Sequence, residues 1–246
     1  MNRRFSIVIP SKRIRNLIPC IRQLRAMGET ARVIVVDDGL TVPLSMPSAE
    51  LAPLLETDVE VIKGADLFVF ARNVNLGIEA AGTDDVLVLN DDVLLETFRG
   101  FSALQTQQNA HPEYGAIGPS FDCSGQLAVM RQMRLREFGE KLYEEKATLI
   151  FACVFIPRSV LDKVGLLDER FGINAGGPRS RGYGCEDDDY SLRIRQAGWK
   201  LGAFDGVLVD HGSLPSTFRH DPQHPIDQFA HEQVFRQKHG RSPRQI

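Results

Sequence analysis

The sequence lacks the features that mark several classes of protein. No apolar run approaches the roughly 18–20 residues that a membrane-spanning helix needs. Its four cysteines are scattered without a Cys-X-X-Cys pair, which argues against both a disulfide framework and a zinc site. The apolar run Phe5–Pro10 is too short for the core of a secretion signal. We therefore expect a soluble, cytoplasmic protein with reduced and mostly buried thiols.

The composition is that of a globular protein, but the charge is unevenly distributed. Of the 246 residues, 43% are hydrophobic and 25% are charged, so the chain can bury a full-sized core. Residues 1–28 carry seven bases and no acid, whereas residues 37–96 carry thirteen acids against two bases, a net charge of −11. The basic segment is either a solvated surface or a contact for the phosphates of a membrane or a nucleic acid.

Short apolar runs alternate with helical patterns in the N-terminal half. We expect strands at 5–9, 33–36, 59–62 and 86–89, helices at 14–27 and 68–81, and a proline-rich loop at 41–53. Strands that are apolar on both faces and separated by helices predict a mostly parallel central sheet flanked by helices.

The C-terminal half is less regular. We expect helices at 97–109, 159–164, 186–197 and 226–238, and strands at 149–156 and 201–209. Between them, residues 171–184 form a glycine-rich segment that we expect to act as a mobile lid. Because no repeat or linker interrupts the chain, we expect residues 1–246 to form a single α/β domain.

Acidic clusters follow two predicted strands and open one predicted helix. Asp37-Asp38-Gly39 and Asn90-Asp91-Asp92 stand at carboxyl ends of strands, where parallel sheets bind ligands. The first could contact a nucleobase or ribose, and the second could hold a divalent cation with substrate phosphates. Either cluster could instead be only a turn or a helix cap. Glu186–Asp189 suits a helix start, although one of its acids could serve as a general base.

The order of these clusters resembles the GT-A nucleotide-sugar glycosyltransferases, and among them the inverting glycosyltransferase family 2. The segments that carry the resemblance are FSIVIPSKRIRN and VIVVDDG within 5–39, ARNVNLGIEAAGTDDVLVLNDDV at 71–93, LLDERFG at 166–172 and GYGCEDDDYSLRIRQAGWKL at 182–201. The resemblance covers roughly residues 5–212 and implies a GT-A (Rossmann-like) fold. Residues 1–95 would then bind the nucleotide sugar, residues 96–220 would hold the acceptor and catalytic groups, and residues 221–246 would form a C-terminal helix.

The resemblance also implies a role for each matching residue. The donor would be bound by Pro10, Ser11, Asp38, Arg72, Asn90 and Asp91, the metal by Asp92 and His211, and the acceptor by Arg181, Tyr183 and Asp188. Asp187 would be the general base, with Glu186 beside it as the second catalytic residue. The sequence departs from the family pattern at Asn90, where Asp is commoner, and at Lys12, where many relatives have an aromatic residue.

The implied reaction is a single displacement at the sugar that inverts the anomeric carbon. It would use Mn²⁺ or Mg²⁺, a nucleotide-sugar donor such as a UDP-sugar, and a glycan or lipid-linked glycan as the acceptor. A hydroxylated base in DNA is the alternative acceptor, and the basic segment leaves peripheral contact with a membrane open. The rival from another class is a non-catalytic module that binds nucleotide sugars or nucleic acid. A nucleotidyltransferase ranks third because Ser11-Lys12-Arg13 has no glycine for a phosphate loop.

Overall fold

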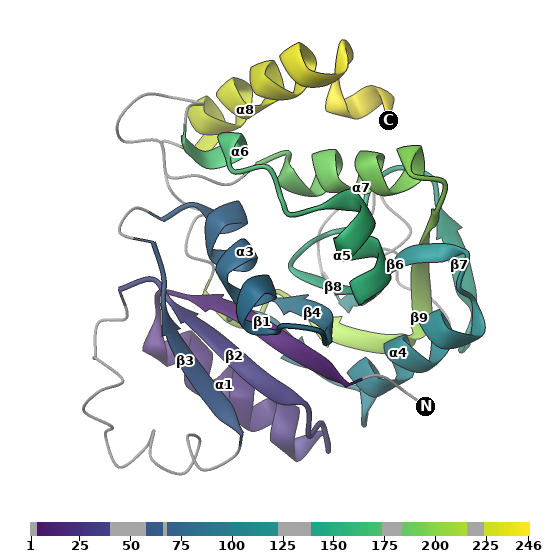
Figure 1. Cartoon of the computed structure of the whole chain (residues 1–246). Helices are drawn as coiled ribbons and strands as arrows, with labels where there is room; N and C mark the ends of the chain where they lie inside the picture. Colours follow the sequence, from purple (N-terminus) through teal and green to yellow (C-terminus); the bar gives the residue numbers. More distant parts are fainter. Residues whose placement is uncertain (1–3, 40–57, 66–67, 123–138, 174–183, 216–223) are drawn as a thin grey trace.

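The computed structural model describes residues 4–39, 58–65, 68–122, 139–173, 184–215 and 224–246, and they form one mixed α/β domain (Figure 1). The strands are β1 (Phe5–Ser11), β2 (Arg32–Asp37), β3 (Val59–Lys63), β4 (Asp85–Leu89), β5 (Leu94–Leu95), β6 (Tyr114–Asp122), β7 (Leu142–Glu145), β8 (Cys153–Ile156) and β9 (Lys200–Asp210). The helices are α1 (Ile14–Ala26), α3 (Phe70–Ala80), α4 (Gly100–Ala110), α5 (Arg158–Val164), α6 (Arg170–Ile173), α7 (Glu186–Gln196) and α8 (His224–His239), followed by the 3-10 helix η2 (Pro243–Gln245).

The described strands form one sheet in the order β3-β2-β1-β4-β8-β6-β9-β5, with β7 paired to β9. The N-terminal strands β1 to β4 pair only in parallel with one another, which confirms the βαβ pattern. The rest of the sheet is mixed, because β8 is antiparallel to both β4 and β6. Ala152, just before β8, accepts a hydrogen bond from the Asn90 amide just after β4. The chain therefore enters β8 at the carboxyl end of β4 and runs back along it.

Alternation along the strands divides the core into two layers. On β1, Ile7 and Ile9 pack in the cluster that holds the buried residues of α1 and α4. Val8 points to the opposite face and packs in the cluster that holds α3, α5 and α7. All three side chains are fully buried, as expected for a central strand with helices on both faces.

Several predicted boundaries were wrong, each for a local reason. Pro10 does not end β1, which continues to Ser11. Proline has no backbone N–H to donate, but the pairing of β1 with β4 already stops at Val8, so no hydrogen bond to β4 is lost at Pro10. The strand predicted from Leu149 starts only at Cys153, since the Leu149 amide donates instead to the Ser191 hydroxyl of α7 at 3.1 Å. Residues 171–173 of the predicted glycine-rich segment belong to the short helix α6.

Three strands were missed altogether. The two residues of β5 are too few to show a periodicity, and β7 carries two glutamates. The sequence of β6, YGAIGPSFD, contains two glycines and a proline, which are typical of a turn. One of them, Gly115, is required by packing, because a Cβ there would lie 2.6 Å from an Ile194 methyl of α7. The predicted loop at 41–53 lies outside the described residues.

We expect Gly77→Ala to destabilise the protein by about 1–3 kcal/mol, the usual cost of overpacking a well-packed core. Gly77 lies on the buried face of α3, and a Cβ there would overlap the Val8 side chain of β1. The exposed Glu79 of the same helix is the matched control, and Glu79→Ala should change stability by less than about 0.5 kcal/mol. Urea unfolding of both variants measures the difference, and equal stabilities would contradict this account of how α3 packs.

Candidate active site

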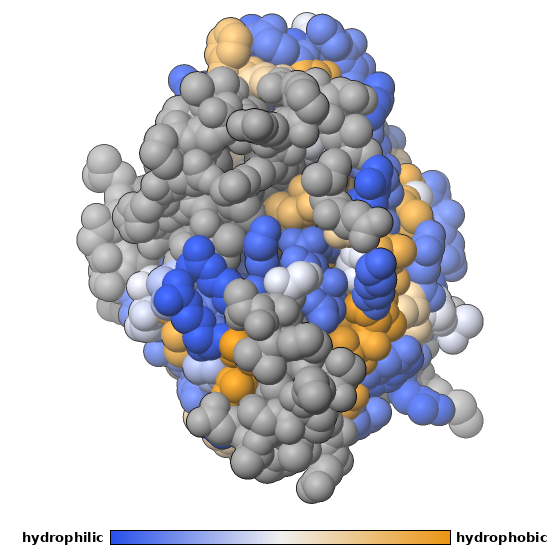
Figure 2. Space-filling model, turned by 90° about the vertical axis from the view of Figure 1, so that its left-hand side faces the viewer, coloured by the Kyte–Doolittle hydropathy of each residue, from blue (hydrophilic) through white to orange (hydrophobic). Residues whose placement is uncertain are grey.

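Three strands that carry predicted donor residues end at the same edge of the sheet. β1 ends at Ser11, β2 ends just before Asp38, and β4 ends just before Asn90. Because β1 lies between β2 and β4 and all three run in parallel, these carboxyl ends are neighbours. This edge lies on the left in Figure 1, and Figure 2 views it directly, with hydrophilic surface in the middle of the face.

Asp38 presents a carboxylate that the described part of the fold does not satisfy. The residue is only 8% exposed, and its Oδ2 is buried without a hydrogen-bond partner among the described residues. Its backbone N–H donates to the Ser11 carbonyl at 2.9 Å, which ties the end of β2 to β1. Burial raises the pKa of Asp38, and the Asn73 amide and Lys12 oppose this rise. A buried acceptor that lacks a donor suits an N–H or hydroxyl group of a ligand.

Asn73, in the first turn of α3, was missed by the sequence analysis. Its side chain is fully buried, and its Oδ1 accepts a hydrogen bond from the Ala65 amide at 3.0 Å. Its Nδ2 is buried without a hydrogen-bond partner among the described residues, although it lies close enough to Asp38 to influence that carboxylate. The signal in the sequence was a polar residue on the helix face that also carries Phe70, Val74 and Ile78.

The other predicted donor residues on β1 and β4 mostly bond to the protein itself. The Ser11 hydroxyl donates to Asp91 Oδ2 at 2.7 Å, so these two side chains join the ends of β1 and β4. Burial, opposed by the Ser11 hydrogen bond and assisted by the charge of Asp92, raises the pKa of Asp91 to about 6. Pro10 is a buried residue of β1. Asn90 forms a turn, in which its carbonyl accepts the Val93 amide.

Asp92 and His211 come together although they are far apart in the sequence. Asp92 follows β4 and His211 follows β9, and the distance from His211 Nε2 to Asp92 Oδ1 is 3.4 Å. The imidazole ring also packs against Phe121, at 5.8 Å between centroids. Asp92 is only 7% exposed, so its carboxylate favours a nearby cation. The described residues contain no group of three or more side chains that could hold a metal ion. One carboxylate and one imidazole therefore suit Mn²⁺ or Mg²⁺ only if the diphosphate and water complete the coordination.

Arg72, predicted to approach the nucleotide, is paired with an acid. Its Nε donates to Glu169 Oε2 at 2.8 Å, and Glu169 Oε1 also accepts from Asn75 at 3.3 Å. Asn75 in turn exchanges two hydrogen bonds with the backbone of Leu167. In this structure Arg72 therefore anchors α3 to the segment before α6.

The four consecutive acids form the first turn of α7, as predicted, and they are not equivalent. Glu186 and Asp189 are buried, whereas Asp187 and Asp188 are partly exposed. Glu186 accepts a hydrogen bond from the Gly184 amide, and Asp187 Oδ1 accepts one from the Asp188 amide at 2.9 Å. Cys185, at the N-cap, has a φ of 64° and no side-chain cap. A non-glycine residue in this region is strained, and such strain is commonest at functional sites.

Three of these acids hold protons more tightly than usual. Burial, together with the charges of Asp188 and Glu186, raises the pKa of Asp187 well above its ordinary value. Burial also raises the pKa of Glu186 to about 7 and that of Asp188 to about 6. A carboxylate whose pKa lies near neutrality is suited to accept a proton, because it is ionised at working pH and still basic.

The remaining predictions concern the acceptor, the thiols and the membrane. Arg181 and Tyr183, like most of the predicted lid, lie outside the described residues. Cys20, Cys153 and Cys185 are free and buried, as expected. Among the helices that the structure describes, none is both long and apolar enough to cross a bilayer.

Comparison with known proteins agrees with this architecture. The crystal structure of GalNAc-T7 with UDP, GalNAc and Mn²⁺ is similar at a TM-score of 0.67 and 15% identity, over 85% of this chain and 44% of that one. Residues 1–349 of S. aureus TarS are similar at 0.60 and 12% identity, over 83% of this chain and 60% of that one. The chain thus spans about half the length of these structures, and at such identities the likeness concerns the fold.

No curated protein matches the sequence. Residues 6–165, however, match the family described as Glycosyl transferase family 2, which is well over half of the chain. With its GT-A-like sheet and the strand-end acids in place, this chain belongs to glycosyl transferase family 2.

Proposed function

We propose that this protein transfers a sugar from a nucleotide-sugar donor, a UDP-sugar, to a hydroxyl group of a glycan or lipid-linked glycan. The observation that carries the proposal is the pairing of Asp92 with His211 at the strand ends that also carry Asp38. Membership of the family supports the reaction class. The presence of UDP and Mn²⁺ with the structurally similar GalNAc-T7 supports the donor and the cation.

In the proposed reaction each residue has a separate task. Asp38 binds the base or ribose through Oδ2, which has no hydrogen-bond partner among the described residues, and Asp92 and His211 hold Mn²⁺ or Mg²⁺. When bound, the cation acts as a Lewis acid on the diphosphate leaving group. Asp187 takes the proton of the acceptor hydroxyl, whose oxygen then attacks the anomeric carbon from the face opposite the nucleotide. A single attack of this kind inverts the anomeric configuration.

The test is a panel of nucleotide sugars incubated with the protein and Mn²⁺. An active transferase slowly transfers its sugar to water when no acceptor is present. One donor of the panel should therefore be hydrolysed in a cation-dependent way. Glycans, lipid-linked glycans and DNA with hydroxylated bases are then added to identify the acceptor. Saturable binding of a nucleotide sugar without any turnover would instead identify a non-catalytic binding module.

Asp38→Asn should raise the KM for the donor with little change in kcat. A contact with the base or ribose is made equally in the ground and transition states, so its loss weakens binding rather than the chemical step. The loss of one hydrogen bond to a charged group corresponds to about 1.5–3 kcal/mol, or roughly 10–150-fold in KM. Glu60→Gln, at an exposed position of β3, is the control. A large fall in kcat with an unchanged donor KM would contradict the proposed role of Asp38.

A further inference from the structure

The first turn of α7 carries the proposed base and begins at a strained backbone. Gly184 and Cys185 precede it with φ values of 141° and 64°, and the Cys185 side chain makes no cap hydrogen bond. The body of α7 is held by the core, where Tyr190 and Ile194 are fully buried. Asp189, the last acid of this first turn, is fully buried, so its carboxylate needs charged or hydrogen-bonding partners.

Such partners come from the C-terminal end of α8. Asp189 is fully buried, and its Oδ1 lies 2.6 Å from Lys238 Nζ and 2.7 Å from His239 Nε2. Its Oδ2 accepts a hydrogen bond from Arg193 Nε, one turn along α7, at 2.9 Å. Two of the three basic side chains that contact Asp189 therefore belong to α8.

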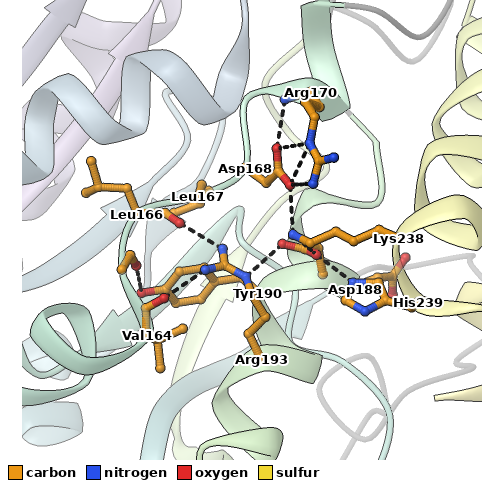
Figure 3. A network of polar contacts seen from close by, with 12 residues as sticks. Val164, Leu166, Leu167, Asp168, Arg170, Asp188, Tyr190, Arg193, Lys238 and His239 are labelled. Atoms are coloured by element: carbon orange, nitrogen blue, oxygen red, sulfur yellow. Dashed lines mark hydrogen bonds and ion pairs between the residues drawn. The ribbon is translucent and has the colours of Figure 1, made fainter.

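Lys238 also connects α7 to the segment before α6. Its Nζ donates to Asp168 Oδ2 at 2.7 Å, and the same carboxylate pairs with Arg170 (Figure 3). Burial alone would raise the pKa of Asp168, but hydrogen bonds from Arg170 and Lys238 outweigh it and hold that pKa well below its usual range. One ammonium group thus bridges the carboxylates of Asp168 and Asp189, and Figure 3 shows Lys238 directed toward Asp168.

An apolar contact lies beside this bridge. Phe235, one turn before Lys238 on α8, is fully buried and packs with Phe171, Cys185 and Leu192. The rings of Phe235 and Phe171 are 6.3 Å apart. α8 therefore holds both α6 and the residue at the N-cap of α7.

We infer that α8 acts as a clasp, in which Lys238 and His239 work through Asp189 as positioning residues that hold Asp187 in its reactive place. The inference rests on the proposed function for the role of Asp187. The donor residues lie elsewhere, on β1, β2, β4 and α3, so loss of the clasp should affect the chemical step and leave donor binding intact. A displacement of about 1 Å at a reacting group can cost about 10²-fold in rate.

Lys238→Met in the full chain is the sharpest test, because it removes the bridging charge and keeps an apolar stem of similar length. Its kcat should fall by about 10–100-fold while the donor KM stays near that of wild type. Lys238→Arg should restore most of the rate, since it returns the charge. Arg236→Met is the matched control, because Arg236 is exposed on the same helix and forms no ion pair with the described residues. If Lys238→Met does not fold, His239→Gln carries the same test.

Hydrogen exchange separates this inference from the proposed function. In Lys238→Met the amides of residues 186–192 should exchange faster than in wild type, and those of β1, β2 and β4 should not change. A wild-type protein that turns over no donor overturns the proposed function, while the exchange pattern still decides whether α8 supports α7. Unchanged exchange in residues 186–192 overturns the clasp, as does a wild-type kcat for Lys238→Met in an active enzyme.

Discussion

Asp187→Asn should lower kcat by roughly 10²–10⁴-fold and leave donor affinity close to that of wild type. Asparagine has nearly the shape of aspartate, and its carbonyl can still accept the Asp188 amide that Asp187 Oδ1 binds at 2.9 Å. What the variant loses is the ability to take a proton. Initial rates at saturating donor and acceptor measure the effect, and Asp162→Asn, an exposed acid on α5, is the control.

Stability distinguishes this role from that of a helix cap. Because burial and neighbouring charges raise the pKa of Asp187 in the folded protein, the folded state binds this proton more tightly than the unfolded state. The ionised carboxylate therefore lowers stability as pH rises, and the neutral amide removes that penalty. At pH 8 the Tm of Asp187→Asn should equal or exceed that of wild type. A lowered Tm with transfer within about threefold of wild type, far short of general-base effects, would move the role of base to Asp188 or Glu186.

The same shifts set the pH dependence of the wild-type enzyme. The raised pKa values, about 6 for Asp188 and about 7 for Glu186, mean that the cluster gains protons when the pH falls through this range. The pKa of Asp187 is raised as well, so the base is lost at a higher pH than it would be for an ordinary aspartate, and kcat should fall while the pH is still well above that of an ordinary carboxyl pKa. An ordinary aspartate would remain ionised down to about pH 4. A kcat that stays constant between about pH 7 and about pH 4 would show that the cluster does not supply the base.

The N-terminal half of the fold was predictable because its signals are local. Apolar runs such as Val33–Val36 lie in central strands buried on both faces, so composition alone marks them. β6 escaped prediction because its two glycines and one proline are tolerated only through contacts with distant residues, as Gly115 shows against Ile194. The antiparallel direction of β8 likewise depends on where the chain returns to the sheet, which no local pattern encodes.

The candidate site, too, was predictable only where its signals are local in the sequence. Strand-end acids could be found from the sequence, because turns after buried strands are marked by Asp, Asn and Gly. The sequence could not show that Asp91 bonds to Ser11, or that Asp189 is a structural acid paired with a helix some 50 residues later. Four consecutive acids look alike in a sequence. Their partners in space distinguish them: among the described residues, Arg193, Lys238 and His239 surround Asp189, whereas Asp187 accepts a backbone amide.

Asp92→Ala should abolish the gain in thermal stability that Mn²⁺ with UDP confers on the wild-type protein. A ligand at 100 times its Kd adds about 2.7 kcal/mol to the stability of the folded state, which is a measurable rise in Tm. His211→Ala should lose most of the same gain, since these two side chains, 3.4 Å apart, are the proposed protein ligands. Asp91→Asn is the matched control, because Asp91 is directed to Ser11 and its amide can still accept that hydroxyl. Differential scanning calorimetry with and without Mn²⁺ and UDP measures the three variants together. If Asp92→Ala retains the wild-type gain while Asp91→Asn loses it, the cation is held by the other aspartate and the pairing with His211 has only a structural role.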